Sequence, residues 1–434
     1  MYTPLFIVLC FLSFFVYRLL KAISVCSKRP NVSRLGSAIW VALDLIGIVH
    51  NPLTVLKRRS RKPIASKWAY SVENIENDLS YIGKSAFASD HVDMLENYKI
   101  LHEEYKEAFE LVSPPSLNVI FIVGMPRSGT TKLHHYLGTS CGDLLSLSFG
   151  RNATPFPLES TRKNLKSLLG LRLASVTTDI QHKHHLDYNM PDEEIHLMTK
   201  LCGYPDNRLL WINTLPSEHY YNCPKSRREM ATIAYECLRK YLCLAQYCWS
   251  VSNDRHWILK SPVHLYPENL NALLKVFPNA KFIHTVRPDH ERTVASYCSL
   301  SWSAQSIFLK SVDKKAVKAN VLEHLRNIRQ GELALDDVER CAEIHFDELV
   351  HNVKEASENA LSALGVDCTL NEADDHQKAP KHIYSLEEYG ITSSDIDYVF
   401  DVHIDDLIKS PSRTLLDDPE ANASPVCKKL SRSC

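Results

Sequence analysis

The chain has 434 residues, and its 50 lysine and arginine residues against 51 aspartate and glutamate residues give a net charge of −1 at pH 7. The hydrophobic fraction of 45% and the charged fraction of 23% are those of a folded globular chain, which excludes a disordered protein and a polytopic membrane protein. A near-neutral balance creates no broad positive field, so nucleic acid is not an expected partner and any anion site must be local.

The first apolar segment is the uncharged run 4–17 (PLFIVLCFLSFFVY), which reaches residue 20 if Arg18 snorkels to the membrane surface. We interpret residues 1–34 as a single-pass membrane anchor with a basic flank. A cleaved signal peptide and a buried core helix are the alternatives. The basic residues follow the apolar run, so the positive-inside rule favours a cytosolic position for the rest of the chain.

Residues 35–113 are predicted to form a helical lead-in to the main domain. The stretch 37–56 is apolar, carries Asp44 and ends at a basic patch (57–62), which fits either an interfacial helix or an amphipathic packing helix. Between about residues 71 and 112, apolar side chains recur with a period of 3.6 residues, which predicts a helix.

Short β-branched apolar runs at 118–123 (NVIFIV) and 281–286 (KFIHTV) have the composition of buried parallel strands. Helical patterns lie between and after them, at 227–251, 267–276 and 316–329. This alternation predicts an α/β fold with a parallel sheet flanked by helices. The last residues, 410–434, have little apolar content and are expected to form a flexible tail.

The sharpest motif, GMPRSGTT at 124–131, lies between the first predicted strand and a helical pattern. A turn containing Gly124 and Gly129 can direct successive backbone N–H groups inward, and the following helix N-terminus adds positive partial charge. Ser128, Thr130 and Thr131 supply hydroxyl groups. These features predict a loop that binds phosphate or sulfate.

The motif is close to the P-loop of nucleoside triphosphatases but differs from it at one position. Thr130 stands where the pattern GxxxxGK[ST] has lysine, and the cation is placed earlier, at Arg127. A triphosphatase uses that lysine, with a magnesium-binding hydroxyl beside it, to neutralise the β and γ phosphates. A P-loop nucleotide kinase is therefore the rival enzyme class rather than the preferred one.

The segment Pro126–Thr131 resembles the signature Pro-[Lys/Arg]-Ser-Gly-Thr-Thr of the sulfotransferase superfamily, especially its large bacterial-type subgroup. The resemblance implies a P-loop-like fold that binds 3′-phosphoadenosine 5′-phosphosulfate (PAPS) as sulfuryl donor, with no metal expected. It also implies that the loop holds the 5′-phosphosulfate and that Arg127 lies near the bridging oxygen. A fixed guanidinium there would stabilise the charge that develops in the transition state.

The segments 257–262 and 277–299 also resemble this family, in which an arginine after a strand and a serine on the next helix bind the 3′-phosphate. The matching residues are Arg287 and Ser296, although they are nine positions apart where eight are expected. Lys260, after the run Trp-Ile-Leu, either faces the sulfate or caps a loop.

The segment 381–390 resembles the motif with which the subgroup covers the nucleotide, which makes His382 and Tyr384 candidate contacts. A helix N-cap at Ser385 with a capping-box carboxylate at Glu388 is a structural explanation that can coexist with a site.

A general base must take the proton of the acceptor hydroxyl. The glutamate that many relatives have after the phosphate-loop helix is missing, since the comparable stretch 145–154 contains no carboxylate. The segment 181–194 resembles the subgroup's His…Pro-Glu-Glu pattern, so we predict His184 as base with Glu193 or Glu194 as its orienting partner. The histidine spacing there does not favour a metal site.

These signals predict a sulfotransferase domain over 114–409 that transfers a sulfuryl group to an acceptor alcohol. An N-terminal anchor is typical of the carbohydrate and protein sulfotransferases of the Golgi, so we expect a single-pass protein of the endoplasmic reticulum or Golgi membrane, with the cytosolic or lumenal face left open. The charge flanks favour a small, lipidic or sterol-like alcohol, and a lumenal carbohydrate sulfotransferase is the close alternative. A membrane-tethered nucleotide-binding protein without catalysis is the non-enzymatic alternative.

Overall fold

The structure of the protein, a computed structural model, describes residues 78–111, 117–158, 183, 187–203, 224–372 and 384–402. The predicted membrane anchor (1–34) and the predicted tail (410–434) lie outside these residues. Within the described part of the chain, no helix is long and apolar enough to cross a membrane.

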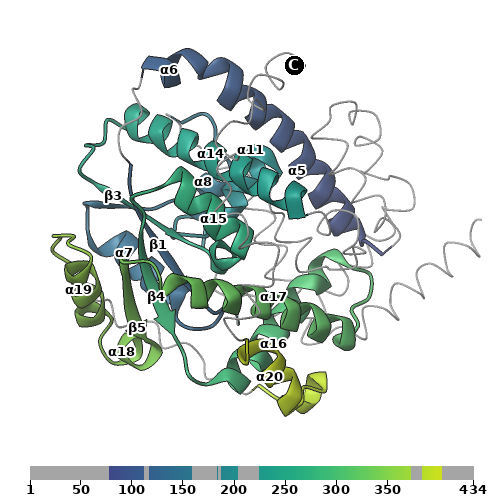
Figure 1. Cartoon of the computed structure of the whole chain (residues 1–434). Coiled ribbons are helices and arrows are strands. Elements are labelled where there is room, and N and C mark those ends of the chain that lie inside the picture. Colours follow the sequence, from purple (N-terminus) through teal and green to yellow (C-terminus); the bar gives the residue numbers. More distant parts are fainter. Residues whose placement is uncertain are drawn as a thin grey trace, which may run out of the picture.

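Five parallel strands form one sheet in the order β2-β3-β1-β4-β5 (Figure 1). Their bounds are Asn118–Gly124 for β1, Leu144–Leu145 for β2, His256–Lys260 for β3, Lys281–Val286 for β4 and Cys341–His345 for β5. The strands predicted at 118–123 and 281–286 are therefore confirmed as β1 and β4. β1 is central because its whole β-branched run is buried and leaves no face for solvent.

Alternate residues of β1 divide the interior into two cores. Ile120 and Ile122 belong to the cluster formed with α7 (Thr130–Ser140) and α19 (Val353–Ala363). Phe121 belongs to the larger cluster on the opposite face of the sheet. Side chains of a strand point alternately to its two faces, so this partition gives a three-layer α/β/α architecture, as predicted in outline.

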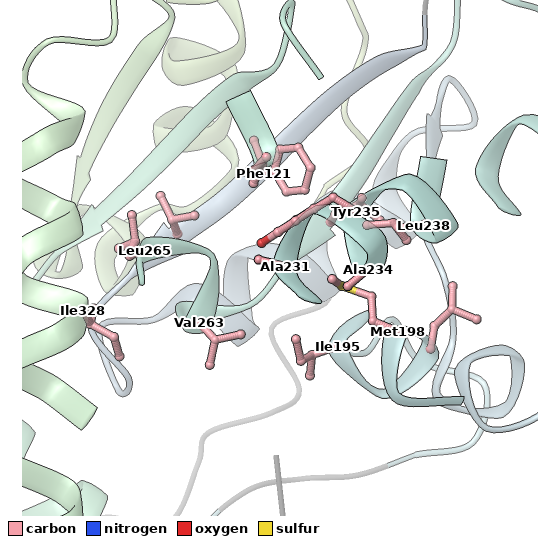
Figure 2. Close-up of a cluster of buried hydrophobic side chains, with 14 of the residues drawn as sticks. Phe121, Ile195, Met198, Ala231, Ala234, Tyr235, Leu238, Val263, Leu265 and Ile328 are labelled. Atoms are coloured by element: carbon pink, nitrogen blue, oxygen red, sulfur yellow. The ribbon is translucent and has the colours of Figure 1, made fainter. Parts of the chain in front are cut away.

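The larger core lies between the sheet and four long helices. These are α14 (Pro224–Cys248), α15 (Pro267–Val276), α16 (His290–Phe308) and α17 (Lys314–Leu335). The helices predicted at 227–251, 267–276 and 316–329 correspond to α14, α15 and α17, and boundaries shift by a few residues at most except at the end of α17. In Figure 2, Phe121 of the sheet faces Ala231, Tyr235 and Leu238 of α14.

Within the described residues 78–111, the helical lead-in predicted over 35–113 is not one continuous helix, and the apolar stretch 37–56 lies outside the described part. Residues 78–111 contain α5 (Tyr81–Lys99), a π-helical turn (Ile100–Glu104) and α6 (Lys106–Leu111), with Tyr105 between the π-helical turn and α6. α5 packs along α11 (Ile195–Cys202), where Lys200 Nζ lies 2.6 Å from Asp93 Oδ2. The lead-in therefore packs against, and forms an ion pair with, the helix that begins directly after the predicted site residue Glu194.

The remaining elements are short. They are α8 (Phe149–Ala153), the 3-10 turns η2 (Pro262–Leu265) and η3 (Glu387–Tyr389), α18 (Phe346–His351) and α20 (Ser393–Phe400). Because all five strands are parallel, the segments that follow their carboxyl ends gather at one edge of the sheet, where ligands of open α/β sheets bind.

Candidate active site

The phosphate loop connects β1 to α7 and requires an unusual backbone. Gly124 has φ +141°, and a Cβ atom there would lie 2.4 Å from the carbonyl oxygen of Thr285 on β4. Gly129 has φ +96° and immediately precedes α7. Arg127 has φ +72°, a conformation that costs a residue with a side chain free energy and persists only where the surrounding structure imposes it. Backbone conformations of this kind cluster at active sites and ligand-binding loops.

Hydrogen bonds within the loop hold this backbone. The Ser128 hydroxyl lies 2.6 Å from the carbonyl oxygen of Met125 and 2.6 Å from Thr285 Oγ1, and Ser128 is fully buried. In this structure Ser128 therefore supports the loop, and its predicted contact with the donor stays a prediction. Thr130 and Thr131 begin α7, where unsatisfied backbone N–H groups favour an anion.

The guanidinium of Arg127 joins segments that are remote in the sequence. Its Nη1 donates to the carbonyl oxygen of Lys183 at 2.8 Å, and its Nη2 donates to the Tyr384 hydroxyl at 3.2 Å. Arg127 and Tyr384 were both predicted as donor-binding residues, and the structure brings them into contact. His382 and His184, which are close to these partners in sequence, lie outside the described residues.

Arg287 follows β4 and reaches the same loop. Its Nη1 donates to the carbonyl oxygen of Arg127 at 2.8 Å, and its guanidinium lies over the Phe346 ring, 4.3 Å from the centroid. Burial lowers the pKa of Arg287, and the nearby charges of Arg292 and Arg127 lower it further, while Asp289 acts in the opposite direction. Positive charges gathered in this way favour a bound anion.

Ser296, predicted to share a phosphate with Arg287, lies on α16 and is 2% exposed. Its hydroxyl donates to the carbonyl oxygen of Thr293 at 3.2 Å. The serine is thus held within its own helix, and its contact with a ligand stays a prediction. At the predicted nucleotide-covering segment, Ser385 accepts a hydrogen bond from the backbone N–H of Glu388 at 3.2 Å, but the short turn η3 begins after Leu386, and the Glu388 carboxylate pairs with Lys314 instead of completing the predicted capping box.

Lys260 ends β3 and is 2% exposed. Its Nζ donates to Glu193 Oε1 at 2.6 Å and to Thr131 Oγ1 at 3.2 Å. Glu193 Oε2 accepts a hydrogen bond from the Ser261 hydroxyl at 3.0 Å. The ammonium of Lys260 therefore lies between a carboxylate and the first turn of the phosphate-loop helix, which places a second cation beside the anion site.

The two predicted glutamates have different surroundings. Glu193 keeps 18% of its side chain exposed, whereas Glu194 has no exposed surface. Glu194 Oε2 accepts from the backbone N–H of Lys260 at 2.8 Å, and Oε1 is hydrogen bonded to His264 Nε2. Both oxygens of each glutamate have partners, but only Glu193 keeps part of its side chain exposed, so Glu193 is the better placed of the two to act on a substrate.

With this geometry in view, comparison with known proteins is decisive at the level of the family. A family model described as the sulfotransferase family matches residues 119–370, which is more than half of the chain. The chain belongs to the sulfotransferase family. A search of curated protein sequences finds no match.

Two solved sulfotransferases are similar to this chain in fold. STF9 from Mycobacterium avium has a TM-score of 0.62 and 20% sequence identity, over 82% of this chain and 95% of that one. STF1 from Mycobacterium tuberculosis H37Rv has a TM-score of 0.57 and 18% identity, over 81% of this chain and 93% of that one. These likenesses extend the α/β sulfotransferase fold over most of the chain.

Several residues of the site have no signal in the sequence. Thr285 lies in an apolar strand, Ser261 and His264 follow Lys260 in an unremarkable turn, and Arg292 is one of many charged helix residues. Their positions depend on the pairing of β1 with β3 and β4, in which Ile122 lies opposite Lys260 and Gly124 opposite Thr285. Only the strand order brings Thr285 to Ser128 of the loop and Ser261 to Glu193.

Proposed function

We propose that this sulfotransferase uses PAPS as its donor and transfers the sulfuryl group to the hydroxyl of an acceptor alcohol. The observation that carries the proposal is the hydrogen bond between Arg287 Nη1 and the carbonyl oxygen of Arg127, at 2.8 Å. It joins the phosphate loop to a second cationic element beyond β4. A donor with two separate phosphate-bearing ends requires two such elements.

The residues at the loop fit the phosphosulfate end of the donor. The N-terminus of α7, the Arg127 guanidinium and the Lys260 ammonium together provide donors and positive charge without a metal ligand set. Glycine at position 129 allows the loop to pack closely against α18, because a Cβ atom there would lie 2.9 Å from Leu349 Cδ1. Arg287, with Arg292 nearby, provides charge for the 3′-phosphate.

Sulfuryl transfer breaks the bond between sulfur and the bridging oxygen and forms a bond from the acceptor oxygen to sulfur. Negative charge develops on the leaving phosphate, where Lys260 and Arg127 would neutralise it. The acceptor proton must go to a base. We assign it to His184, oriented by Glu193, since Glu193 is the more exposed of the two neighbouring carboxylates.

The acceptor class and the membrane anchor are proposals from the sequence. The basic residues after the apolar run support a cytosolic active site and a small, lipidic or sterol-like alcohol. Transfer of labelled sulfuryl groups to a panel of sterols, lipid alcohols, phenols and sugars would test this preference. Carbonate extraction and protease protection of the full chain in microsomes would test the anchor and its orientation.

The experiment that tests the donor is calorimetric binding of adenosine 3′,5′-bisphosphate to the full chain without magnesium, beside the Arg127→Ala and Arg287→Ala variants. Binding by the parent and weaker binding by both variants is the expected result. If the parent binds ATP with magnesium and not the bisphosphate, the sulfotransferase assignment of the donor is wrong and a kinase activity is favoured.

A further inference from the structure

The neighbouring carboxylates Glu193 and Glu194 both hold the carboxyl end of β3, but from different sides. Glu193 accepts from the Lys260 ammonium and the Ser261 hydroxyl, on the side of the phosphate loop. Glu194 accepts from the backbone N–H of Lys260 and turns into the core, where it meets His264. Glu194 therefore binds the backbone N–H of Lys260, and Glu193 binds its ammonium.

The inward carboxylate belongs to a chain of buried polar groups. His264, on η2, is fully buried, and its Nδ1 lies 2.6 Å from the hydroxyl oxygen of Tyr235. Tyr235 is also fully buried and comes from α14. Figure 2 shows Tyr235 extending from α14 toward the segment that carries Val263 and Leu265, the neighbours of His264. The Phe121 ring lies edge-on to the His264 imidazole, with 4.9 Å between the ring centroids, and this contact limits the orientation of the imidazole.

The available donors and acceptors fit one arrangement of protons. Burial, and then the charge of Glu194, raise the pKa of Tyr235 well above its usual range, so its hydroxyl keeps its proton and donates to His264 Nδ1. A neutral imidazole that accepts at Nδ1 carries its proton at Nε2 and donates to Glu194 Oε1. Glu194 Oε2 accepts from the Lys260 N–H, so every member is satisfied when the carboxylate is ionised.

The alternative states leave a buried group without a partner. If His264 were doubly protonated, both ring nitrogens would donate, and the Tyr235 hydroxyl proton would lose its acceptor. An orphaned polar group in the interior is costly, because it has given up water without a replacement. Glu194 is also the N-cap residue of α11, where the helix N-terminus favours a negative charge.

We propose that Tyr235, His264 and Glu194 are positioning residues that fix the end of β3 through an ordered proton-donor chain and so hold the Lys260 ammonium at the transfer site. The inference rests on the proposed function for its kinetic consequence. Its structural content, the ionised Glu194 and the Nε2–H tautomer of His264, is independent of the donor and the acceptor.

The same helix offers a matched control. Tyr241 of α14 is fully buried as well. Its hydroxyl donates to the carbonyl oxygen of Pro155 at 3.1 Å and is not part of the hydrogen-bonded series Tyr235–His264–Glu194. Tyr235→Phe and Tyr241→Phe each delete one buried hydroxyl from α14. Only the first removes a donor to His264, so a purely structural role for Tyr235 predicts equal effects of the two substitutions.

The kinetic experiment compares Glu194→Gln, Tyr235→Phe and Tyr241→Phe in the full chain. We expect Glu194→Gln to lower kcat by about 10- to 100-fold, since displacement of a positioned group by about 1 Å can have an effect of up to this size. The affinity for adenosine 3′,5′-bisphosphate should stay within about threefold of the parent, because the phosphate loop and Arg287 are untouched. Tyr235→Phe should lower kcat more than Tyr241→Phe.

The spectroscopic experiment uses protein with ¹⁵N-labelled histidine, in which the His264 signals are those missing from His264→Gln. We expect the Nε2–H tautomer in the parent, and a switch to Nδ1–H in Glu194→Gln, whose amide N–H₂ faces Nε2. A doubly protonated His264, or an Nδ1–H tautomer in the parent, overturns the proposal, as do equal kinetic effects of the two tyrosine substitutions. If the parent fails to bind the bisphosphate, the donor assignment fails, and the tautomer measurement still decides the proton arrangement.

Discussion

The ammonium of Lys260 lies 2.6 Å from Glu193 Oε1 and 3.2 Å from Thr131 Oγ1, so one buried cation connects the end of β3 with the first turn of the phosphate-loop helix. Lys260 is 2% exposed, so its ammonium is shielded from solvent in this position. Electrostatic stabilisation is strongest where water is excluded.

Lys260→Met keeps the length of the side chain and removes its charge. We expect kcat for sulfuryl transfer to fall by about 100-fold or more, which is the usual effect of deleting one preorganised electrostatic contact to a transition state. Steady-state kinetics with an acceptor from the screen would measure it. Lys354→Met is the control, because Lys354 pairs with Glu372 on the surface of α19. Equal kcat values for the two variants would contradict a catalytic role for Lys260.

Arg287→Ala should weaken binding of adenosine 3′,5′-bisphosphate by about 10- to 100-fold, because a charge-assisted contact to phosphate is lost together with the hydrogen bond to the loop. The matched control is Arg340→Ala. Arg340 also donates to main-chain carbonyl oxygens, of Ala280 and Pro278, but at the opposite end of β4. Calorimetry on both variants should show a loss only for Arg287; a similar loss for Arg340→Ala would point to a general effect on the sheet.

Gly129→Ala tests the backbone of the phosphate loop. At φ +96° a residue with a Cβ is strained, and we expect a loss of about 1–3 kcal/mol in the free energy of unfolding. Donor binding should be lost as well, because the loop must rotate its amides away to relieve the strain. Gly142→Ala is the control, since a Cβ at Gly142 has no heavy atom within 4 Å. Urea denaturation and calorimetry would measure both effects.

If Gly129→Ala binds the bisphosphate as well as the parent does, the positive φ of this glycine is not needed for anion binding.

His134 of α7 gives a prediction for the pH dependence of stability. Burial, followed by the charges of Lys260 and His135, lowers its pKa to about 3. Between pH 3 and 6.5 the unfolded chain therefore binds more protons at this site than the folded protein does, and the free energy of unfolding falls as the pH falls. At pH 5 this lowers the free energy of unfolding by about 2 kcal/mol relative to neutral pH.

His134→Gln removes this titration, and its amide can still donate to the carbonyl oxygen of Ile258, which His134 Nε2 approaches at 3.3 Å. The difference in unfolding free energy between pH 7 and pH 5 should shrink by about 2 kcal/mol. His351→Gln, at an exposed position, is the control. An unchanged pH dependence in His134→Gln would mean that His134 is not kept neutral by burial.

The sequence determined two of the five strands, β1 and β4, together with the phosphate loop and the family. β1 and β4 are short continuous apolar runs, and a parallel strand buried on both faces requires such a run. The loop was predicted because its glycines, Arg127 and hydroxyls are consecutive, so local spacing contains the whole motif. For the same reason the helical lead-in was predicted, although its π-helical turn was not, since the apolar period continues through it.

Only the tertiary structure decided which side chains surround that loop. Lys260 was predicted ambiguously, because a lysine after a strand has the same sequence pattern whether it faces a ligand or caps a turn. The pairing of β3 beside β1 brings it to Thr131 and Glu193. The sequence also did not predict that Glu193 and Glu194 have different partners. They are adjacent residues of the same type, and only the fold determines the direction in which each side chain points. Glu194 is buried and contacts His264, whereas Glu193 stays partly exposed beside Lys260.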